Sequence, residues 1–242
     1  MKRETTPKLA AIALLLFSSF PGAAAAEEIA VGISEDIKSV EFTRDGEKFT
    51  IIRNQDTRNT VTPAFALTSR PCPPFCIQPM VVAPGVETIA ELEVIDFITR
   101  MAAGDDSILV IDSRTPDWVA RGTIPGAVNS PWSEISPQSG ATTESIIKIL
   151  TGKFAAALAE GADEISVDEA LVEGTTSEVF DYTNAKTLVL FCNGMWCGQS
   201  PSNIRILLKF GYPAEKLKWY RGGIQDWEIL GLSTVKPPKG KP

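Results

Sequence analysis

Two stretches near the N-terminus alternate apolar and polar residues, which is the pattern of strands with one buried face. They cover residues 40–42 and 49–51 and flank the dipeptide Asp45-Gly46. Asp-Gly suits the positive φ angles that a type I′ turn requires. The pattern therefore predicts a β-hairpin, which we place in a small β-rich region at residues 27–87.

Three later runs are short and mainly apolar, as buried strands of a parallel sheet are. They cover residues 108–111, 187–191 and 217–220, and helical patterns lie between them at 143–158 and 202–210. Strands that alternate with helices predict an α/β fold, with a parallel sheet flanked by helices.

A further helix is expected to begin near residue 88. Thr88 and Glu91 have the spacing of a capping box, in which each side chain bonds to a free backbone N–H group. Apolar residues then repeat on one helical face, at Ile89, Leu92, Ile95 and Ile98.

These elements place the main domain at residues 88–235. Within it, residues 132–185 form a long insertion that contains turns, a helical pattern and the acidic run 160–173. We expect the acidic run to be a solvated surface. The last residues, 236–242, have no apolar anchor and are predicted to be a flexible tail.

The first 26 residues have the layout of a cleavable secretory signal. A basic start is followed by the apolar run 9–20, then by Pro21-Gly22 and four alanines. The apolar run is shorter than the ~20 residues that cross a bilayer. We therefore expect cleavage after Ala26 and a periplasmic or otherwise secreted protein.

Composition removes several classes of function. The chain carries a formal net charge of −7, and loss of three basic residues and one acidic residue with the signal makes the rest more acidic. No basic cluster remains, so nucleic acid and membrane surfaces are not expected partners.

The sequence has no histidine. This excludes Ser-His-Asp and Cys-His catalysis, histidine metal ligands and haem attached through C-x-x-C-H.

Four cysteines are present: Cys72, Cys76, Cys192 and Cys197. An exported protein can keep disulfides, but counting alone does not separate the three pairings. Cys72 and Cys76 lie in the proline-rich segment 70–79, which suits neither a helix nor a central strand. A local disulfide that staples this segment is our main interpretation; a second redox pair, a bridge to the Cys192 loop and a four-thiolate zinc site are alternatives.

The stretch with the clearest chemistry joins the predicted strand 187–191 to the helix after it. Cys192 follows the strand directly, and a loop with two glycines leads to Ser200-Pro201, a pair suited to cap and begin a helix. This places a thiol at the edge where α/β sheets bind ligands. Loop N–H groups and the helix dipole favour a thiolate there, so we expect Cys192 to be a nucleophile with a depressed pKa.

Two separate blocks of sequence resemble rhodanese-like domains. The first runs from Ile111 to Asn129 and reads IDSRTPDWVARGTIPGAVN, similar to the family pattern I-D-x-R…G-H-I-P-G-A-x-N. The second begins with the Cys192 loop and is similar to the family series C-loop, L-x-x-x-G-[FY] and L-x-G-G-x-x-x-W; its members here are Leu208, Gly211-Tyr212, Tyr220 to Gly223 and Trp227. The resemblance covers roughly residues 89–235 and leaves the N-terminal region outside.

The resemblance implies a rhodanese-like sheet and a catalytic Cys192 that accepts sulfane sulfur as a persulfide. It implies structural roles for Asp112 and Arg114 at the end of the first strand. It also implies that the loop lines the substrate site, through Asn193, Gly194, Met195, Trp196, Gly198, Gln199 and Ser200. The expected partners are a small sulfur donor, similar to thiosulfate, and a thiol or other nucleophilic acceptor. No cofactor and no metal are implied.

Three departures from the family pattern stand out. Thr123 occupies the position of the usual histidine, which we interpret as structural. The loop carries no arginine, and Cys197 stands near the place where many relatives have one. The spacing from Cys192 to Gly211 is slightly longer than expected, which predicts an expanded loop and a wider pocket.

Cys197 leaves three interpretations open. In the first, Cys197 attacks a Cys192 persulfide or sulfenate and resolves it as an internal disulfide. In the second, it forms a permanent disulfide that inactivates the site. In the third, it only fills space beside Trp196.

The leading function is sulfur transfer by Cys192. The alternatives are a thiol–disulfide oxidoreductase that uses Cys192 and Cys197, and a non-catalytic module that binds sulfur or anions. Phosphatase chemistry ranks lower because Gly198 stands where a phosphate-binding arginine would be needed.

Overall fold

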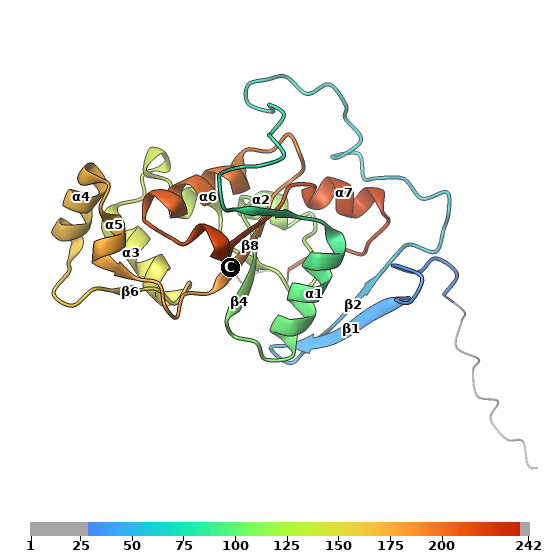
Figure 1. Cartoon of the computed structure of the whole chain (residues 1–242). Coiled ribbons are helices and arrows are strands. Elements are labelled where there is room, and N and C mark those ends of the chain that lie inside the picture. Colours follow the sequence, from blue (N-terminus) through green and yellow to red (C-terminus); the bar gives the residue numbers. More distant parts are fainter. Residues whose placement is uncertain (1–28, 238–242) are drawn as a thin grey trace, which may run out of the picture.

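A computed structural model of the chain describes residues 29–237. The predicted signal segment (1–26) and residues 238–242 of the predicted tail (236–242) lie outside these residues. At the centre is a parallel sheet of five strands in the order β3-β9-β8-β4-β5; Figure 1 labels two of its inner strands, β4 and β8. Its strands are β3 (Glu87–Ile89), β4 (Ile108–Asp112), β5 (Val128–Asn129), β8 (Thr187–Phe191) and β9 (Leu217–Tyr220). The three apolar runs of the sequence are therefore the three inner strands, as predicted.

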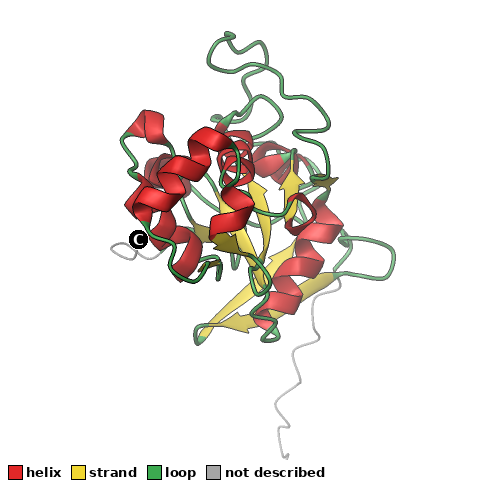
Figure 2. Ribbon diagram, turned by 60° about the vertical axis from the view of Figure 1, so that its left-hand side comes forward, coloured by secondary structure: helices red, strands yellow, loops and turns green. Residues whose placement is uncertain are grey.

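Helices cover both faces of the sheet, so the chain has the α/β architecture predicted from the sequence (Figure 2). The family-like part contributes α1 (Glu91–Ala102), α2 (Pro116–Val119), α6 (Gln199–Lys209) and α7 (Gly223–Ile229), with short 3-10 turns at Trp132–Glu134, Pro137–Ser139 and Ala214–Lys216. Among residues 29–237, none of the helices has the length and apolar character needed to span a bilayer.

The buried residues form two clusters, one on each face of the sheet. Leu188 and Leu190 of β8 point into the first cluster with α6 and the insertion, whereas Val189 and Phe191 point into the second with α1 and α7. This partition follows from the two-residue period of a strand. Cys192 belongs to the second cluster, the one that also takes in residues from the N-terminal region.

The start of α1 differs from the prediction. The helix begins at Glu91 rather than near Thr88, and the Glu93 carboxylate, not Glu91, accepts the hydrogen bond from the free N–H group of Ala90. Residues 87–89 pair instead with β9, and the Thr88 hydroxyl donates to the carbonyl of Met80. Because this pairing is a long-range contact, local capping signals did not reveal it. The predicted apolar face is also only partly right, since Leu92 is half exposed.

The predicted hairpin is present as β1 (Ser39–Arg44) and β2 (Glu47–Ile52). Asp45 and Gly46 have φ angles of 51° and 79°, the positive values that the turn prediction requires. The hairpin packs against α1 and the second cluster through its apolar face.

The insertion folds beside the sheet as α3 (Thr143–Gly152), β6 (Ala157–Leu158), α4 (Glu164–Glu173), α5 (Thr176–Val179) and β7 (Phe180–Asp181). The helix predicted to reach residue 158 ends at Gly152, because Ala155 takes a positive φ of 57° and the chain turns into β6. In the acidic run, Val167 and Ala170 are buried, while the carboxylates of α4 face solvent.

Candidate active site

Cys192 lies at the carboxyl end of β8, between the ends of β4 and β9. The loop after it is held by α7: the backbone N–H groups of Ile224 and Gln225 donate to the carbonyls of Cys192 and Asn193, each at 3.0 Å. Gly223 makes this close approach possible, since a Cβ there would lie 2.3 Å from the Cys192 carbonyl oxygen. The two-glycine element 222–223 is thus a turn that packs against the loop.

The Cys192 sulfur is buried and surrounded by hydrogen-bonding groups. The Ser200 hydroxyl lies 3.1 Å from Sγ and donates to it. The backbone N–H groups of Gly194 and Ser200 also point at the sulfur. As a thiol, Cys192 can place its own proton toward the Cys197 carbonyl oxygen at 3.4 Å. The site is therefore built to accept negative charge on this sulfur.

These contacts determine the acidity of the thiol. Burial raises the pKa of Cys192, but hydrogen bonds from the Cys197 thiol, the Ser200 hydroxyl and the two backbone N–H groups outweigh it and lower the pKa to about 7. A substantial fraction of the Cys192 side chains is therefore in the thiolate form at neutral pH, and the thiolate is the nucleophilic form.

Cys197 is the second thiol of the site. Both cysteines are free and buried. Burial raises the pKa of Cys197, and the neighbouring Cys192 raises it further by hydrogen bonding and charge repulsion. Cys197 therefore stays protonated, and its sulfur also lies 3.8 Å from the Gln199 side-chain oxygen, a second acceptor for its single proton.

Ser200 does not cap the following helix as its position suggested. α6 begins at Gln199 with Gly198 as its N-cap residue, and no side chain caps it. The Ser200 hydroxyl is turned to the Cys192 sulfur instead, because a buried thiolate needs a donor more than a partly exposed helix end does.

Asp112 and Arg114 form a buried ion pair beneath the loop. Arg114 Nη2 lies 2.6 Å from the Asp112 carboxylate and 2.6 Å from the Gly122 carbonyl oxygen. Its Nη1 donates at 3.4 Å to the Asn193 side chain. The pair therefore connects the end of β4 to the first residue of the loop, without contacting the sulfur itself.

The predicted site residues divide by exposure. Asn193, Gly194, Trp196 and Ser200 are buried, Met195 and Gln199 are half-buried, and Gly198 is exposed. The side chains of Asn193 and Trp196 bond away from the sulfur, to Arg114 and to Gln225. Of the loop amides expected to line an anion site, those of Gly194 and Ser200 face the sulfur, while the Cys197 N–H group donates to the Gly194 carbonyl.

A segment from the N-terminal region covers this loop. We call residues 61–80 the cover segment. Phe75 meets Trp196 edge-on with ring centres 5.5 Å apart, and the Gln78 N–H group donates to the Met195 carbonyl at 2.8 Å. Phe65 belongs to the same buried cluster as Cys192. The loop is therefore enclosed by residues that lie outside the predicted domain.

The side chains of Arg70, Arg221 and Gln225 also hold the cover segment in place beside the loop. The Arg70 guanidinium lies 4.0 Å from the ring centre of Trp196. Arg221 donates to the carbonyls of Gln78 and Pro79. Gln225 accepts from the Trp196 indole and donates to the Phe65 carbonyl. The contacts made by the cover segment left no local signal in the sequence, because they join residues about 120 to 160 positions apart.

Cys72 and Cys76 form a disulfide inside the cover segment. Their Cα atoms are 4.6 Å apart, and the bridge closes the turn that carries Phe75. This is the pairing preferred from the sequence. A four-cysteine zinc site is incompatible with it, and residues 29–237 contain no other group of three or more potential metal ligands.

The sequence between residues 96 and 230 matches the family model described as the rhodanese-like domain. The match spans more than half of the chain. This chain belongs to the rhodanese-like domain family. The match begins after the cover segment, so the part of the protein that encloses the Cys192 loop lies outside the family model.

Two solved structures are similar to the chain. One is the solution NMR structure of the rhodanese-like domain from an Anabaena sp. protein, at 15% identity and a TM-score of 0.32, covering 66% of this chain and 85% of that one. The other is a crystal structure of a Bacillus halodurans protein, at 16% identity and a TM-score of 0.34, covering 65% and 85%. A search of curated protein sequences found no significant match.

Proposed function

We propose that this rhodanese-like protein is an exported sulfurtransferase in which Cys192 carries sulfur as a persulfide. One observation supports it above all: the Ser200 hydroxyl, the Cys197 thiol and two backbone N–H groups surround the Cys192 sulfur and favour its thiolate. The same donors can stabilise the negative terminal sulfur of a persulfide. Family membership alone leaves the activity open, because one fold hosts many functions.

The chemistry needs two balanced steps. The Cys192 thiolate attacks the outer sulfur of a donor such as thiosulfate, an S–S bond forms, and sulfite leaves with the electron pair of the broken bond. A thiolate acceptor then attacks the outer sulfur of the persulfide. Cys192 leaves as a thiolate, and the acceptor becomes a persulfide.

Export is part of the proposal. The segment 1–26 has the pattern of a secretory signal, and a disulfide such as Cys72–Cys76 persists in oxidising compartments. The expected partners are therefore a small sulfur donor and a thiol acceptor outside the cytosol.

Intact-mass measurement tests the sulfur transfer. Purified protein is incubated with thiosulfate and, separately, with a mercaptopyruvate-type donor. We expect a gain of one sulfur atom that is absent in Cys192→Ser and retained in Cys197→Ser. Failure of both the wild-type protein and the Cys72→Ser/Cys76→Ser variant to gain sulfur from either donor would contradict the proposal.

The two free, buried cysteines of the same loop, Cys192 and Cys197, support a second candidate, a thiol–disulfide oxidoreductase. Here Cys192 and Cys197 would form a reversible disulfide. Titration against glutathione buffers, read by peptide mapping, tests this. A pair that stays reduced, or that forms a bond which physiological thiols do not reopen, rules the oxidoreductase out.

A further inference from the structure

We infer that Trp219 is a positioning residue for Cys192 and acts through Ser200. The inference deepens the proposed function, since it rests on Cys192 as the nucleophile. Trp219 Nε1 lies 3.2 Å from the Ser200 hydroxyl oxygen, and that oxygen lies 3.1 Å from the Cys192 sulfur. The three side chains form a continuous hydrogen-bonded chain from the sheet to the thiol.

The chemistry of the indole gives this chain a fixed direction. An indole N–H group can only donate a hydrogen bond, whereas a hydroxyl has one proton and can rotate it. Because Trp219 donates to the Ser200 oxygen, the hydroxyl must use its own proton elsewhere, and the Cys192 sulfur is the partner within reach. All three residues are at most 2% exposed, so water does not compete for these bonds.

The fold brings the three groups together from separate elements. Trp219 lies on β9 opposite Leu190 of β8, two residues before Cys192. Ser200 is the second residue of α6, which packs on the same face of the sheet as Trp219. Without the indole, the hydroxyl could rotate away from the sulfur. The thiolate would then lose its side-chain oxygen donor, and the Cys192 pKa would rise.

The test measures the rate of Cys192 alkylation against pH, with the site identified by peptide mapping. For Trp219→Phe we expect the midpoint of this pH–rate curve, which reports the pKa of Cys192, to move upward from about 7. The rate at neutral pH should fall about threefold or more, because each pKa unit is a tenfold change in the thiolate-to-thiol ratio. Trp227→Phe is the matched control: it also removes a fully buried indole, but that indole donates to the Ser233 carbonyl. Its midpoint should stay at the wild-type value.

Ser200→Ala keeps the inference falsifiable even if Trp219→Phe folds poorly. Its midpoint should rise at least as far as that of Trp219→Phe, and the double variant should add nothing to it. An unchanged midpoint in Ser200→Ala, or an additive shift in the double variant, would overturn the inference that Trp219 acts on Cys192 through Ser200. Alkylation needs no sulfur donor, so this outcome is independent of whether the protein transfers sulfur.

A different set of contacts carries a second inference. We propose that the cover segment is a gate over Cys192 that the Cys72–Cys76 disulfide holds closed. Cys192 is 2% exposed, and Phe65, Val61, Ala64 and Phe75 of the cover segment pack in its cluster. Two clefts of the described residues, around Arg53 and around Glu91, are lined by residues other than Cys192 and its loop. A donor or acceptor must therefore displace part of the cover to reach the sulfur.

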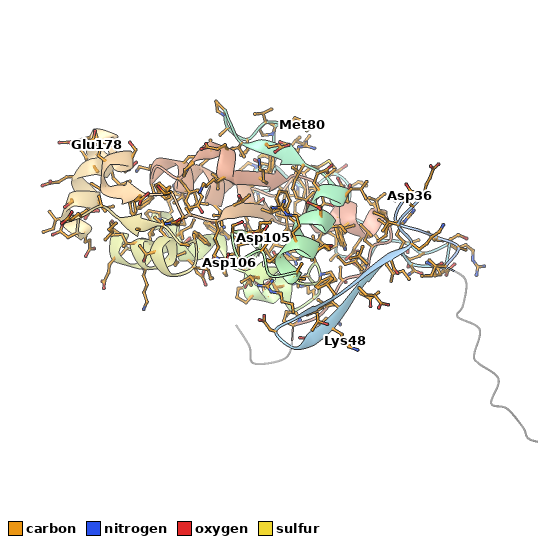
Figure 3. All side chains as sticks on the ribbon, turned by 60° about the horizontal axis from the view of Figure 1, so that its bottom comes forward. Asp36, Lys48, Met80, Asp105, Asp106 and Glu178 are labelled. Atoms are coloured by element: carbon orange, nitrogen blue, oxygen red, sulfur yellow. A yellow bond between two sulfur atoms is a disulfide. The ribbon has the colours of Figure 1, made fainter. Side chains whose placement is uncertain are left out.

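The disulfide is placed to control this displacement. Cys72 is exposed and Cys76 half-buried, so a reductant can reach the bridge. A dithiol reductant would transfer two electrons and two protons to the S–S bond, giving two thiols and its own disulfide. The turn that holds Phe75 against Trp196 then loses its covalent closure, and its backbone gains freedom. Two hydrophobic residues of the cover segment, Ile77 and Met80, are already exposed; Met80 is labelled in Figure 3.

The rate of Cys192 alkylation by a bulky maleimide tests the gate. The double variant Cys72→Ser/Cys76→Ser should react several-fold faster than the parent at one pH, and Phe75→Ala should also react faster with its disulfide intact. Ile77→Ala, at an 82% exposed position of the same segment, is the matched control and should react at the parent rate. Equal rates in the parent and the double variant would overturn the gate, whether or not sulfur transfer is found.

Discussion

The side-chain hydroxyl of Thr123 donates a 2.7 Å hydrogen bond to the buried carboxylate of Asp112. Thr123 stands where the family pattern has histidine, and the hydroxyl supplies a donor to the carboxylate from that position. We expect Thr123→Val to lower the free energy of unfolding by ~1–3 kcal/mol, because a buried acceptor loses a partner. Urea denaturation measures this change.

Thr123→Ser is the matched control, since it keeps the hydroxyl and should lose less stability than the valine variant. If valine and serine variants were equally stable, the hydrogen bond would make no net contribution. The Cys192 alkylation rate of both variants should stay near the wild-type value, because Thr123 does not contact the loop sulfur.

Arg114 and Asp112 are both almost completely buried, so breaking the pair leaves a charge without its partner. We expect Arg114→Met to destabilise the protein by ~3–5 kcal/mol. The loss should also loosen Asn193, which accepts from the guanidinium, and with it the start of the loop. Thermal unfolding measures the first effect. Arg121→Met, at an exposed arginine, should change stability little; comparable losses in the two variants would contradict the role of the buried pair.

Gly223 permits the contact between α7 and the Cys192 loop. Its φ is +58°, and a Cβ would lie 2.3 Å from the Cys192 carbonyl oxygen and 2.8 Å from the Gly194 nitrogen. Gly223→Ala should therefore destabilise the protein and also change the Cys192 alkylation rate. Gly140→Ala also places alanine at a positive φ, but in open space. It should cost only ~1–2 kcal/mol and leave the alkylation rate unchanged. Similar behaviour of the two variants would argue against a steric contact at the loop.

The ionisation of Cys192 should also appear in the pH dependence of stability. Its folded pKa of about 7 lies below the ordinary value of 9.0, so the unfolded state binds more protons between these values. The free energy of unfolding should therefore gain a contribution as pH rises through this window, fully present above 9.0 and lost as pH falls through 7. Cys197 has a raised pKa, so it adds no stability from ionisation in this window.

Urea denaturation of wild type and Cys192→Ser at about pH 6 and about pH 8.5 measures this linkage. The stability of wild type relative to the variant should be greater at the higher pH. A difference that is equal at both pH values would mean that the thiolate is not favoured by the fold.

Several elements could be predicted because their signals are local. Asp45-Gly46 marked a turn whose φ angles only a few residue types accept, and the apolar run 187–191 marked a strand buried on both faces. The start of α1 was wrong because residues 87–89 pair with β9, about 130 residues away. The cap assigned to Ser200 was wrong for a related reason, since its hydroxyl bonds to Cys192 across the loop and to Trp219 on another strand.

By itself, the sequence determined the α/β class, the family, and the position of Cys192 at a strand end before a glycine-containing loop. Alternation, turn chemistry and spaced motifs are properties of neighbouring residues, so they can be read along the chain. Only the tertiary structure decided what surrounds the thiol: Ser200 and Trp219 on one side, and the cover segment 61–80 with its disulfide on the other. Hydrogen bonds and burial in three dimensions set the acidity and access of a buried thiol, and they depend on residues that the sequence places far apart.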